Sequence, residues 1–142
     1  QHAASDVVII GAGPTGLTCA IGLLKSGISC KIFDQRDTTT TESRGMVIHA
    51  MTLEELGAFG NDIVQQLIAK GRKITQSNTI NRRKVVAVAR LSTRDDTIYD
   101  YALILPQSDT EQILSDEVKR LGGEIYWNTR VDEVIESDEV VE

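Results

Sequence analysis

This chain of 142 residues contains little of what metal sites, disulfides and membrane spans require. Its two cysteines, Cys19 and Cys30, form neither a CxxC pair nor a metal-ligand pattern, so we expect two buried thiols. Its two histidines, His2 and His49, are too few and too far apart to suggest a metal site. No apolar stretch approaches the roughly 20 residues that a membrane-spanning helix needs, so no span is predicted.

The chain also has no basic surplus, and its first residues do not resemble a secretory leader. Its net charge of −6 argues against a nucleic-acid partner, because phosphate backbones bind clustered lysines and arginines. Residues 1–6 have neither the basic start nor the apolar stretch of a signal peptide, which predicts a soluble, cytoplasmic protein. Residues 71–94 carry seven basic residues and no acid; this run either attracts a phosphorylated cofactor or forms the solvated face of strands.

Only 4% of the residues are aromatic, but the hydrophobic content of 41% can supply the core of one domain. The most informative segment is the apolar run Val7-Val8-Ile9-Ile10 with the glycine-rich turn that follows it, Gly11-Ala12-Gly13-Pro14-Thr15-Gly16. The run has no polar alternation, which predicts a strand buried on both faces of a parallel sheet. The turn predicts a site for a dinucleotide pyrophosphate at the start of a helix.

Each part of this turn has a distinct expected role. Gly11 permits the tight exit from the strand, Gly13 lets the backbone approach the phosphates, and Gly16 allows the helix to pack close to the sheet. Pro14 suits the first helical turn, where its missing N–H has no partner to lose. Thr15 lies in the same turn and is expected to contribute to the cofactor site.

A helix and a second strand complete the pattern. The helix is predicted from apolar residues at helical spacing and ends at Gly27; these residues are Leu17, Ala20, Ile21 and Leu24. Strand 30–33 follows and leads into Asp34, 18 residues after Gly16, close to the expected distance of about 20 for the acid that accepts from a ribose hydroxyl. The alternative is a βαβ unit whose glycines are incidental and which binds no nucleotide.

The middle of the chain contains a polar loop, two helices and three strands. Residues 35–43 read as the loop. A capping box, Thr52 with Glu55, predicts a helix that ends near Gly57 or Gly60, and Asn61-Asp62 can cap a second helix that Gly71 ends. Short polar turns join the three candidate strands, which we therefore expect to pair antiparallel; they cover 73–80, 84–91 and 97–103.

The last part returns to alternating helix and strand. Ser108 to Glu111 reads as another capping box, Gly122-Gly123 ends the helix, and strand 124–127 is expected beside strand 30–33. Residues 131–136 read as a strand, 137–138 as a turn, and 139–142 as the start of a return strand. The predicted fold class is α/β, a Rossmann-like FAD/NAD(P)-binding parallel sheet with a small antiparallel insertion. It looks incomplete at the C-terminus, so we expect a further C-terminal segment or a complementing chain.

Three landmarks in this order resemble the N-terminal portion of FAD-dependent aromatic hydroxylases, the class A flavoprotein monooxygenases of the p-hydroxybenzoate hydroxylase and phenol hydroxylase type. The first is the glycine turn 11–17 with Asp34. The second is 43–45 with the helix 52–56 and Phe59-Gly60. The third is Leu105-Pro106-Gln107 with Glu111, Gly122-Gly123, a strand and Arg130-Val131. They span nearly the whole chain.

The resemblance implies further cofactor contacts. Arg44 would reach the FAD pyrophosphate, where a guanidinium fork suits phosphate oxygens; otherwise it is an arginine solvated in a loop. Gln107 would contact the ribitol or phosphate region of FAD, or else serve as a helix cap or turn residue. Arg36, beside Gln35 in the expected adenine region, would lie over the adenine, and the backbone of Val131 would meet the adenine edge.

The residues that correspond to the segment near the flavin ring are 46–49, but a single loop histidine is not enough to make His49 catalytic. One departure is Met51, where the family often has an arginine. The catalytic residues therefore stay unknown.

The resemblance implies an FAD-dependent monooxygenase that uses NADH or NADPH and O₂ to hydroxylate a small aromatic or related substrate. In this interpretation residues 1–142 form a partial FAD-binding domain, and 73–104 form an antiparallel insertion that belongs to the substrate-side sheet. Two alternatives remain: an inactive truncated or split dinucleotide-binding module, and a non-oxygenating FAD or NAD oxidoreductase.

Overall fold

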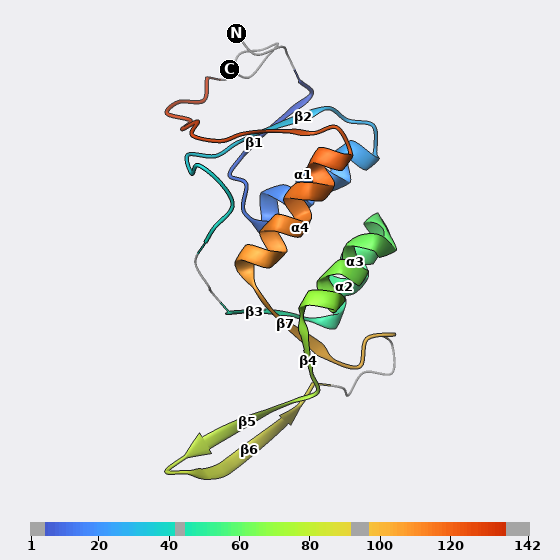
Figure 1. Ribbon diagram of the computed structural model, residues 1–142, viewed down its shortest axis with the longest axis vertical. Helices are drawn as coiled ribbons and strands as arrows, with labels where there is room; N and C mark the ends of the chain where they lie inside the picture. Colours follow the sequence, from blue (N-terminus) through green and yellow to red (C-terminus); the bar gives the residue numbers. More distant parts are fainter. Residues whose placement is uncertain (1–4, 42–44, 92–96, 136–142) are drawn as a thin grey trace. The chain divides into compact units, whose positions relative to one another are not determined.

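The structure, a computed structural model, describes residues 5–41, 45–91 and 97–135. The chain forms two compact units: residues 1–40 with 114–142, and residues 41–113 (Figure 1). Each unit has its own sheet. Within the described ranges, every helix is too short or too polar to serve as a membrane span.

The first unit contains a three-stranded parallel sheet in the order β1-β2-β8. Strand β1 is Val7–Ile10, β2 is Cys30–Phe33, and β8 is Glu124–Tyr126. Val7 pairs with Cys30, and Lys31 pairs with Glu124. The predicted placement of the third parallel strand beside the second is therefore confirmed, and the α/β fold class with it.

Strand β1 lies at the edge of this sheet and, within the described part of the chain, only one of its faces is buried, so the prediction that it is buried on both faces is wrong. Ile9 faces the core, but Val8 is 50% exposed and Ile10 is 59% exposed. In the described part of the chain, β1 pairs only with β2. An apolar run predicts burial on both faces only where neighbouring elements cover both faces.

Helix α1, Pro14–Lys25, connects β1 to β2 and turns Leu17, Ala20 and Ile21 into the core. Its end is a Schellman-type turn: the N–H of Ile28 donates to the carbonyl of Leu23 at 2.9 Å, and Gly27 has φ of +77°. The predicted glycine stop is confirmed. Cys30 is buried and burial raises the pKa of its thiol, but Cys19 is exposed on α1, so the expectation of two buried thiols fails for Cys19.

Helix α4, Gln107–Arg120, begins in the second unit and ends in the first. Its C-terminal half lies beside α1 (Figure 1), where Lys25 Nζ is 3.7 Å from the Glu117 carboxylate. Arg120 donates to both oxygens of Glu117 at 2.6 and 2.7 Å. These hydrogen bonds hold the pKa of Glu117 below its ordinary value despite burial. Gly122, with φ of +83°, ends the helix as predicted.

The second unit contains an antiparallel sheet in the order β3-β7-β4. These strands are Gly45–Ile48, Ala102–Pro106 and Arg72–Ile74. Two consecutive helices complete the unit, α2 at Ala50–Phe59 and α3 at Asn61–Lys70. The core of this unit is aliphatic; its fully buried side chains include Leu53, Ile63, Leu67, Leu103 and Leu105.

Three strand predictions need correction. The strand expected over 97–103 lies at 102–106, because 97–101 alternate like a strand but form no ladder with a neighbour. The strand expected over 73–80 is divided at Thr75 into β4 and β5. Residues 131–135 form no strand, because they have no partner strand in the described part; residues 136–142 lie outside it. Strand β3 was not predicted.

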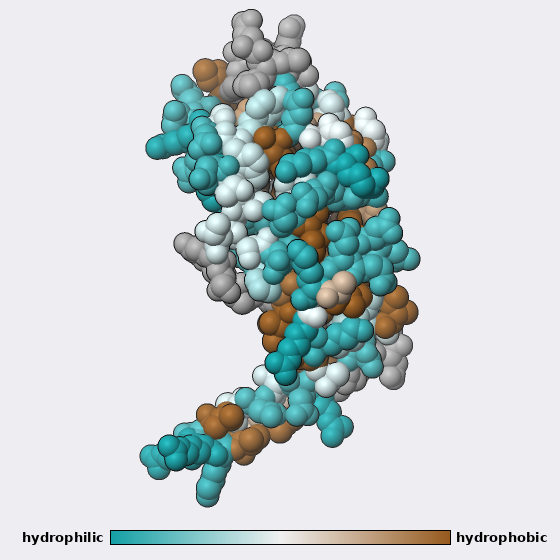
Figure 2. Space-filling view, in the orientation of Figure 1, coloured by the Kyte–Doolittle hydropathy of each residue, from teal (hydrophilic) through white to brown (hydrophobic). Residues whose placement is uncertain are grey.

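Strands β5, Gln76–Asn81, and β6, Lys84–Arg90, form a hairpin whose two-residue turn is Arg82-Arg83. Both arginines have positive φ, +43° and +64°, as a type I′ turn requires. Every residue of the two strands is exposed, and Figure 2 shows apolar side chains along the hairpin. The more exposed ones are Ile80, Val85, Val86 and Val88. The antiparallel insertion predicted within the fold class is confirmed.

All three predicted helix caps are wrong. Helix α2 begins at Ala50, so Thr52 lies inside it, and its N-terminal flanking residue is His49. Helix α3 begins at Asn61 itself, after Gly60. Helix α4 begins at Gln107, so Ser108 lies inside the first turn. In each case the chain enters the helix one to three residues before the capping residues.

Candidate functional site

The glycine turn connects β1 to α1 by a very tight path. Gly11 has φ of +104°, a conformation that L side chains rarely adopt, and its N–H donates to the Phe33 carbonyl at 2.8 Å. A Cβ on Gly16 would lie 2.0 Å from the Gly11 carbonyl oxygen, whereas a Cβ on Gly13 would meet nothing within 4 Å. Gly16 therefore permits close packing of helix on strand, and Gly13 faces open space.

The amino end of α1 has the properties of an anion site. Pro14 is its first residue, Gly13 precedes it, and among the described residues no side chain caps the helix. The first N–H groups of a helix have no partner within the helix, and the helix dipole places partial positive charge there. The turn therefore offers backbone donors and positive potential to a diphosphate.

Asp34 lies at the carboxyl end of β2 and is only 7% exposed. Its Oδ2 accepts from the N–H of Ala12 at 2.7 Å and from Arg36 Nη2 at 2.9 Å. Its Oδ1 accepts from the Arg36 N–H at 2.8 Å and from Arg36 Nε at 3.1 Å. Burial alone would raise the pKa of Asp34, but these hydrogen bonds outweigh burial and hold the pKa below its ordinary value.

A cavity of about 330 Å³ opens beside this carboxylate. Small-molecule sites generally measure roughly 300–1,000 Å³. The cavity brings together five of the residues expected at the cofactor site: Gly11, Asp34, Gln35, Arg36 and Val131. Pro14, Thr15 and Gly16 lie on the adjoining first turn of α1.

Backbone hydrogen bonds tie the segment after β8 to this site. The N–H of Thr129 donates to the carbonyl of Asp34 at 2.9 Å, and the N–H of Asn128 donates to the carbonyl of Arg36 at 2.8 Å. This pairing explains how Val131, far along the chain, lines the same cavity as Gly11. The site therefore lies at the carboxyl ends of all three parallel strands.

Four further residues line the cavity and were not predicted as site residues: Ile10, Phe33, Thr129 and Arg130. They follow or end the three parallel strands. The rule that ligands bind outside the carboxyl ends of the strands of an open α/β sheet could have identified them.

The structure places the two remaining expected residues neither in this cavity nor in the adjoining glycine turn. Arg44 lies outside the described residues. Gln107 is the first residue of α4, in the second unit, and its Nε2 donates to Glu111 Oε1 at 2.8 Å. Glu111 is fully buried. The flavin contact that the resemblance implies for Gln107 stays a prediction.

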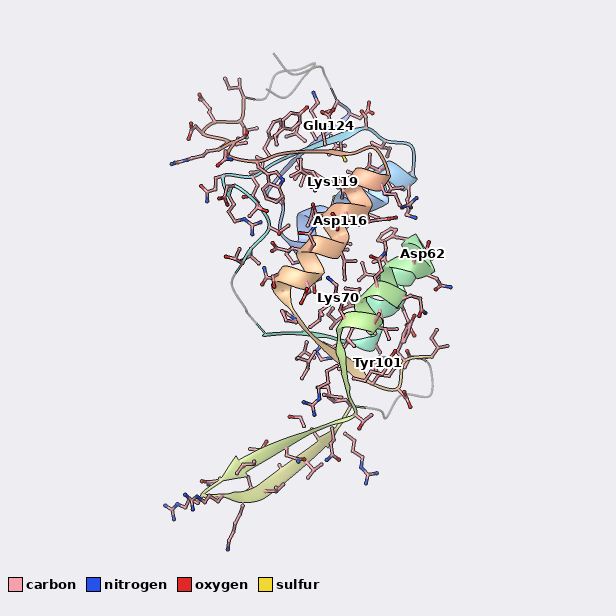
Figure 3. All side chains as sticks on the ribbon, in the orientation of Figure 1. Asp62, Lys70, Tyr101, Asp116, Lys119 and Glu124 are labelled. Atoms are coloured by element: carbon pink, nitrogen blue, oxygen red, sulfur yellow. The ribbon has the colours of Figure 1, made fainter. Side chains whose placement is uncertain are left out.

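The second unit contains a larger cavity of about 430 Å³. The start of α2, including His49 and Thr52, lines it together with Tyr101, which Figure 3 labels. Lys73 Nζ lies 4.3 Å from the centre of the Tyr101 ring, and Tyr99 meets that ring edge to face. Burial, with Tyr101 and Glu54, raises the pKa of Tyr99.

The fold agrees with what comparison with known proteins shows. A family described as FAD binding domain matches residues 4–142. The 6-methylpretetramide 4-monooxygenase of Streptomyces rimosus is 32% identical over 127 residues, which are 89% of this chain and 22% of that protein. The uncharacterized aromatic compound monooxygenase YhjG of Bacillus subtilis is 30% identical over 142 residues, 96% of this chain and 26% of that protein.

A solved structure establishes the likeness of the fold. The crystal structure of p-nitrophenol 4-monooxygenase PnpA from Pseudomonas putida matches with a TM-score of 0.91 at 23% identity, covering 99% of this chain and 36% of that one. The chain thus spans about a quarter of the length of the two sequence relatives, 22% and 26%. It belongs to the FAD-binding domain family, and the relatives that it matches are monooxygenases.

Proposed function

We propose that the adenosine diphosphate half of FAD binds in the cavity of the first unit. We also propose that the whole protein is an FAD-dependent monooxygenase of a small aromatic substrate, with NADH or NADPH as the reductant. The family match supports the cofactor, and the relatives named above support the reaction class and the aromatic substrate. FAD supplies the redox chemistry when bound, and the protein supplies binding and orientation.

The residues present fit such a group. A Cβ on Gly13 would meet nothing within 4 Å, and the backbone N–H groups that begin α1 follow this residue, which suits a diphosphate. The cavity beside Asp34 has room for the adenosine, with Phe33 and Val131 as apolar neighbours. The resemblance adds Arg44 for the pyrophosphate and Gln107 for the ribitol or phosphate region.

The observation that carries this proposal is the buried, ionised carboxylate of Asp34 at the end of β2. A buried carboxylate accepts hydrogen bonds and cannot donate them when ionised, so it favours hydroxyl groups over phosphate oxygens. Its place between the glycine turn and the cavity suits the ribose that joins an adenine to a diphosphate.

The test compares FAD affinity in full-length protein for Asp34→Asn and for Asp37→Asn. Asp37 is an exposed acid three residues away, so its substitution removes the same charge without touching the buried site. Asp34 also fixes the glycine turn through the Ala12 N–H, and a hydrogen bond to a charged group contributes roughly 1.5–3 kcal/mol, so Asp34→Asn should weaken FAD binding by about tenfold or more. Asp37→Asn should leave the affinity nearly unchanged, and equal effects of the two substitutions would contradict the proposal.

Activity is tested separately from binding. The bound cofactor, released by heat and identified by mass, distinguishes FAD from NAD. Consumption of NADH or NADPH that increases with an added phenol, with ¹⁸O from labelled O₂ in the product, supports the monooxygenase. FAD without oxygen incorporation would instead support a non-oxygenating oxidoreductase, and binding without NAD(P)H consumption would support a binding module.

A further inference from the structure

The Asp34 carboxylate is already fully engaged by protein donors. An ionised carboxylate has about four lone-pair positions. Each oxygen of Asp34 accepts one backbone N–H and one guanidinium N–H: Oδ1 from the Arg36 backbone and Nε, Oδ2 from the Ala12 backbone and Arg36 Nη2. A ribose hydroxyl therefore finds no free acceptor position while the Arg36 side chain stays in place.

The two backbone donors are fixed by the fold. The Ala12 N–H belongs to the glycine turn, directly after Gly11, and the Arg36 N–H belongs to the segment that follows β2. The guanidinium is different: the Arg36 side chain is 34% exposed, whereas that of Asp34 is 8% exposed. Removing the guanidinium would free one lone pair on each oxygen. Two acceptors side by side are what the vicinal 2′- and 3′-hydroxyls of a ribose require.

From this match we infer that the Arg36 guanidinium occupies the positions of the ribose diol, so that dinucleotide binding must displace it from Asp34. Arg36 thereby determines how strongly the site prefers a ligand with both ribose hydroxyls over one that lacks them. Each hydrogen bond that Asp34 gains from the ribose replaces one that it loses from the guanidinium. This inference rests on the proposed function and adds to it a residue that limits ribose recognition.

The displaced guanidinium has a second place nearby. In the structure the Arg36 guanidinium carbon lies 6.0 Å from the centre of the Trp127 ring, the outer limit for a cation–π contact. Trp127 follows β8, and the N–H of the next residue, Asn128, donates a hydrogen bond to the Arg36 carbonyl. The backbone of Arg36 therefore stays in place while its side chain rotates. Replacement of the Arg36–Asp34 ion pair by ribose hydrogen bonds therefore needs only rotation of the Arg36 side chain.

The experiment uses flavin-free, full-length protein and two probes, ADP and 2′,3′-dideoxyadenosine 5′-diphosphate, titrated by calorimetry. The ratio of their dissociation constants measures diol discrimination, and it is independent of attraction to the phosphates, which both probes share. We expect a small ratio in the wild type and a ratio about tenfold larger in Arg36→Met, since a hydrogen bond to a charged group contributes a factor of roughly ten or more.

The matched control is Arg130→Met. Arg130 lines the same cavity and pairs with Asp132 rather than Asp34. Its substitution removes one positive charge from the cavity and should leave the ratio unchanged. An unchanged or smaller ratio in Arg36→Met would overturn the inference while the proposed function stands. Failure of ADP to bind any variant would overturn both.

A second measurement needs no change at Arg36 and keeps the test independent of that variant's folding. In the wild type, ADP should change the fluorescence that is lost in Trp127→Phe, because the guanidinium moves relative to the indole. The dideoxy probe carries the same adenine but leaves the ion pair in place, so its signal should be clearly smaller. Equal signals from the two probes would sink the inference.

Discussion

The two units contain apolar strands of similar sequence character with opposite environments. Strand β7 lies between β3 and β4 and buries Ala102, Leu103 and Leu105, whereas β1 lies at the edge of its sheet and exposes Val8 and Ile10. Both runs are almost uninterrupted by polar residues. This difference shows that an apolar run indicates a strand suited to burial. Whether the strand is buried depends on the neighbouring elements that cover it.

The units also differ in what their tightest contacts involve. In the first unit a Cβ added at Gly16 would collide with a backbone atom, the Gly11 carbonyl oxygen, beside the proposed nucleotide site. In the second unit the core consists of aliphatic side chains such as Leu103. Substitutions should therefore act through backbone displacement in the first unit and through lost packing in the second.

The largest effect is expected from Gly16→Ala. The new Cβ would lie 2.0 Å from the Gly11 carbonyl oxygen, a backbone atom that can move only if β1 and α1 separate. We expect the free energy of unfolding to fall by more than about 4 kcal/mol, at the extreme of single substitutions. Urea denaturation followed by circular dichroism measures it.

Gly13→Ala is the matched control for this comparison. Its Cβ meets nothing within 4 Å, and its φ of −79° suits any residue. Stability should change by less than about 1 kcal/mol, while FAD affinity falls because the methyl group enters the space proposed for the diphosphate. If both glycine variants are equally stable, the tight contact at Gly16 does not exist in solution.

Leu103→Ala tests the second unit. Leu103 is fully buried in β7, so truncation should lower the free energy of unfolding by about 2–5 kcal/mol through lost burial and a cavity. Val88→Ala on the hairpin removes apolar atoms from a side chain that is 54% exposed and should change stability by about 0.5 kcal/mol or less. Equal losses would show that the hairpin is covered in solution, which would narrow the contrast between buried and exposed strands.

The acid dependence of the first unit gives a smaller effect. The ordinary pKa of Glu117 is 4.5, and its pKa in the folded chain is lower, chiefly through hydrogen bonds from Arg120. A lowered folded pKa stabilises the fold above the ordinary value, and this contribution is lost as the pH falls from about 4.5 through the folded pKa. The wild type should therefore exceed Glu117→Gln in stability at pH 7, and the gap should close in acid. A stability difference between wild type and Glu117→Gln that stays constant between pH 7 and pH 3 would contradict a lowered pKa of Glu117.

The smallest effect is expected from Thr52→Ala. A capping threonine would contribute roughly 1 kcal/mol, but Thr52 lies inside α2 and no side chain caps this helix among the described residues. We expect a change within about 0.5 kcal/mol in thermal or urea denaturation. A loss near 1 kcal/mol would favour the capping box that the sequence pattern predicted over the helix start at Ala50.

The first unit was largely predictable because its signals are local or obligatory. The glycine turn, the helix start at Pro14 and the stop at Gly27 are each properties of a few consecutive residues. Asp34 was predictable from its distance to Gly16, since β1, α1 and β2 form one continuous unit. The partners of Asp34 were not, because Ala12 and Arg36 donate to it through the arrangement of two strand ends.

The second unit was predicted less well because weaker patterns compete there. Thr97 to Tyr101 alternate as a strand should, yet the ladder forms at 102–106, where β3 and β4 flank the chain. Capping residues at Thr52, Asn61 and Ser108 indicated helices correctly but misplaced their first residues. A capping side chain acts through one hydrogen bond, and the packing of a helix against its neighbouring elements outweighs it.

The local sequence thus determines the βαβ element, its glycine turn and the acid that follows β2. Some backbone conformations are open mainly to glycine, and apolar residues at helical spacing fix which segment is the helix, so few local structures are possible. Which faces are buried, which segments pair and which donors surround Asp34 depend on residues distant in the chain. Those outcomes follow from the neighbours that folding brings together, and a local pattern contains no information about them.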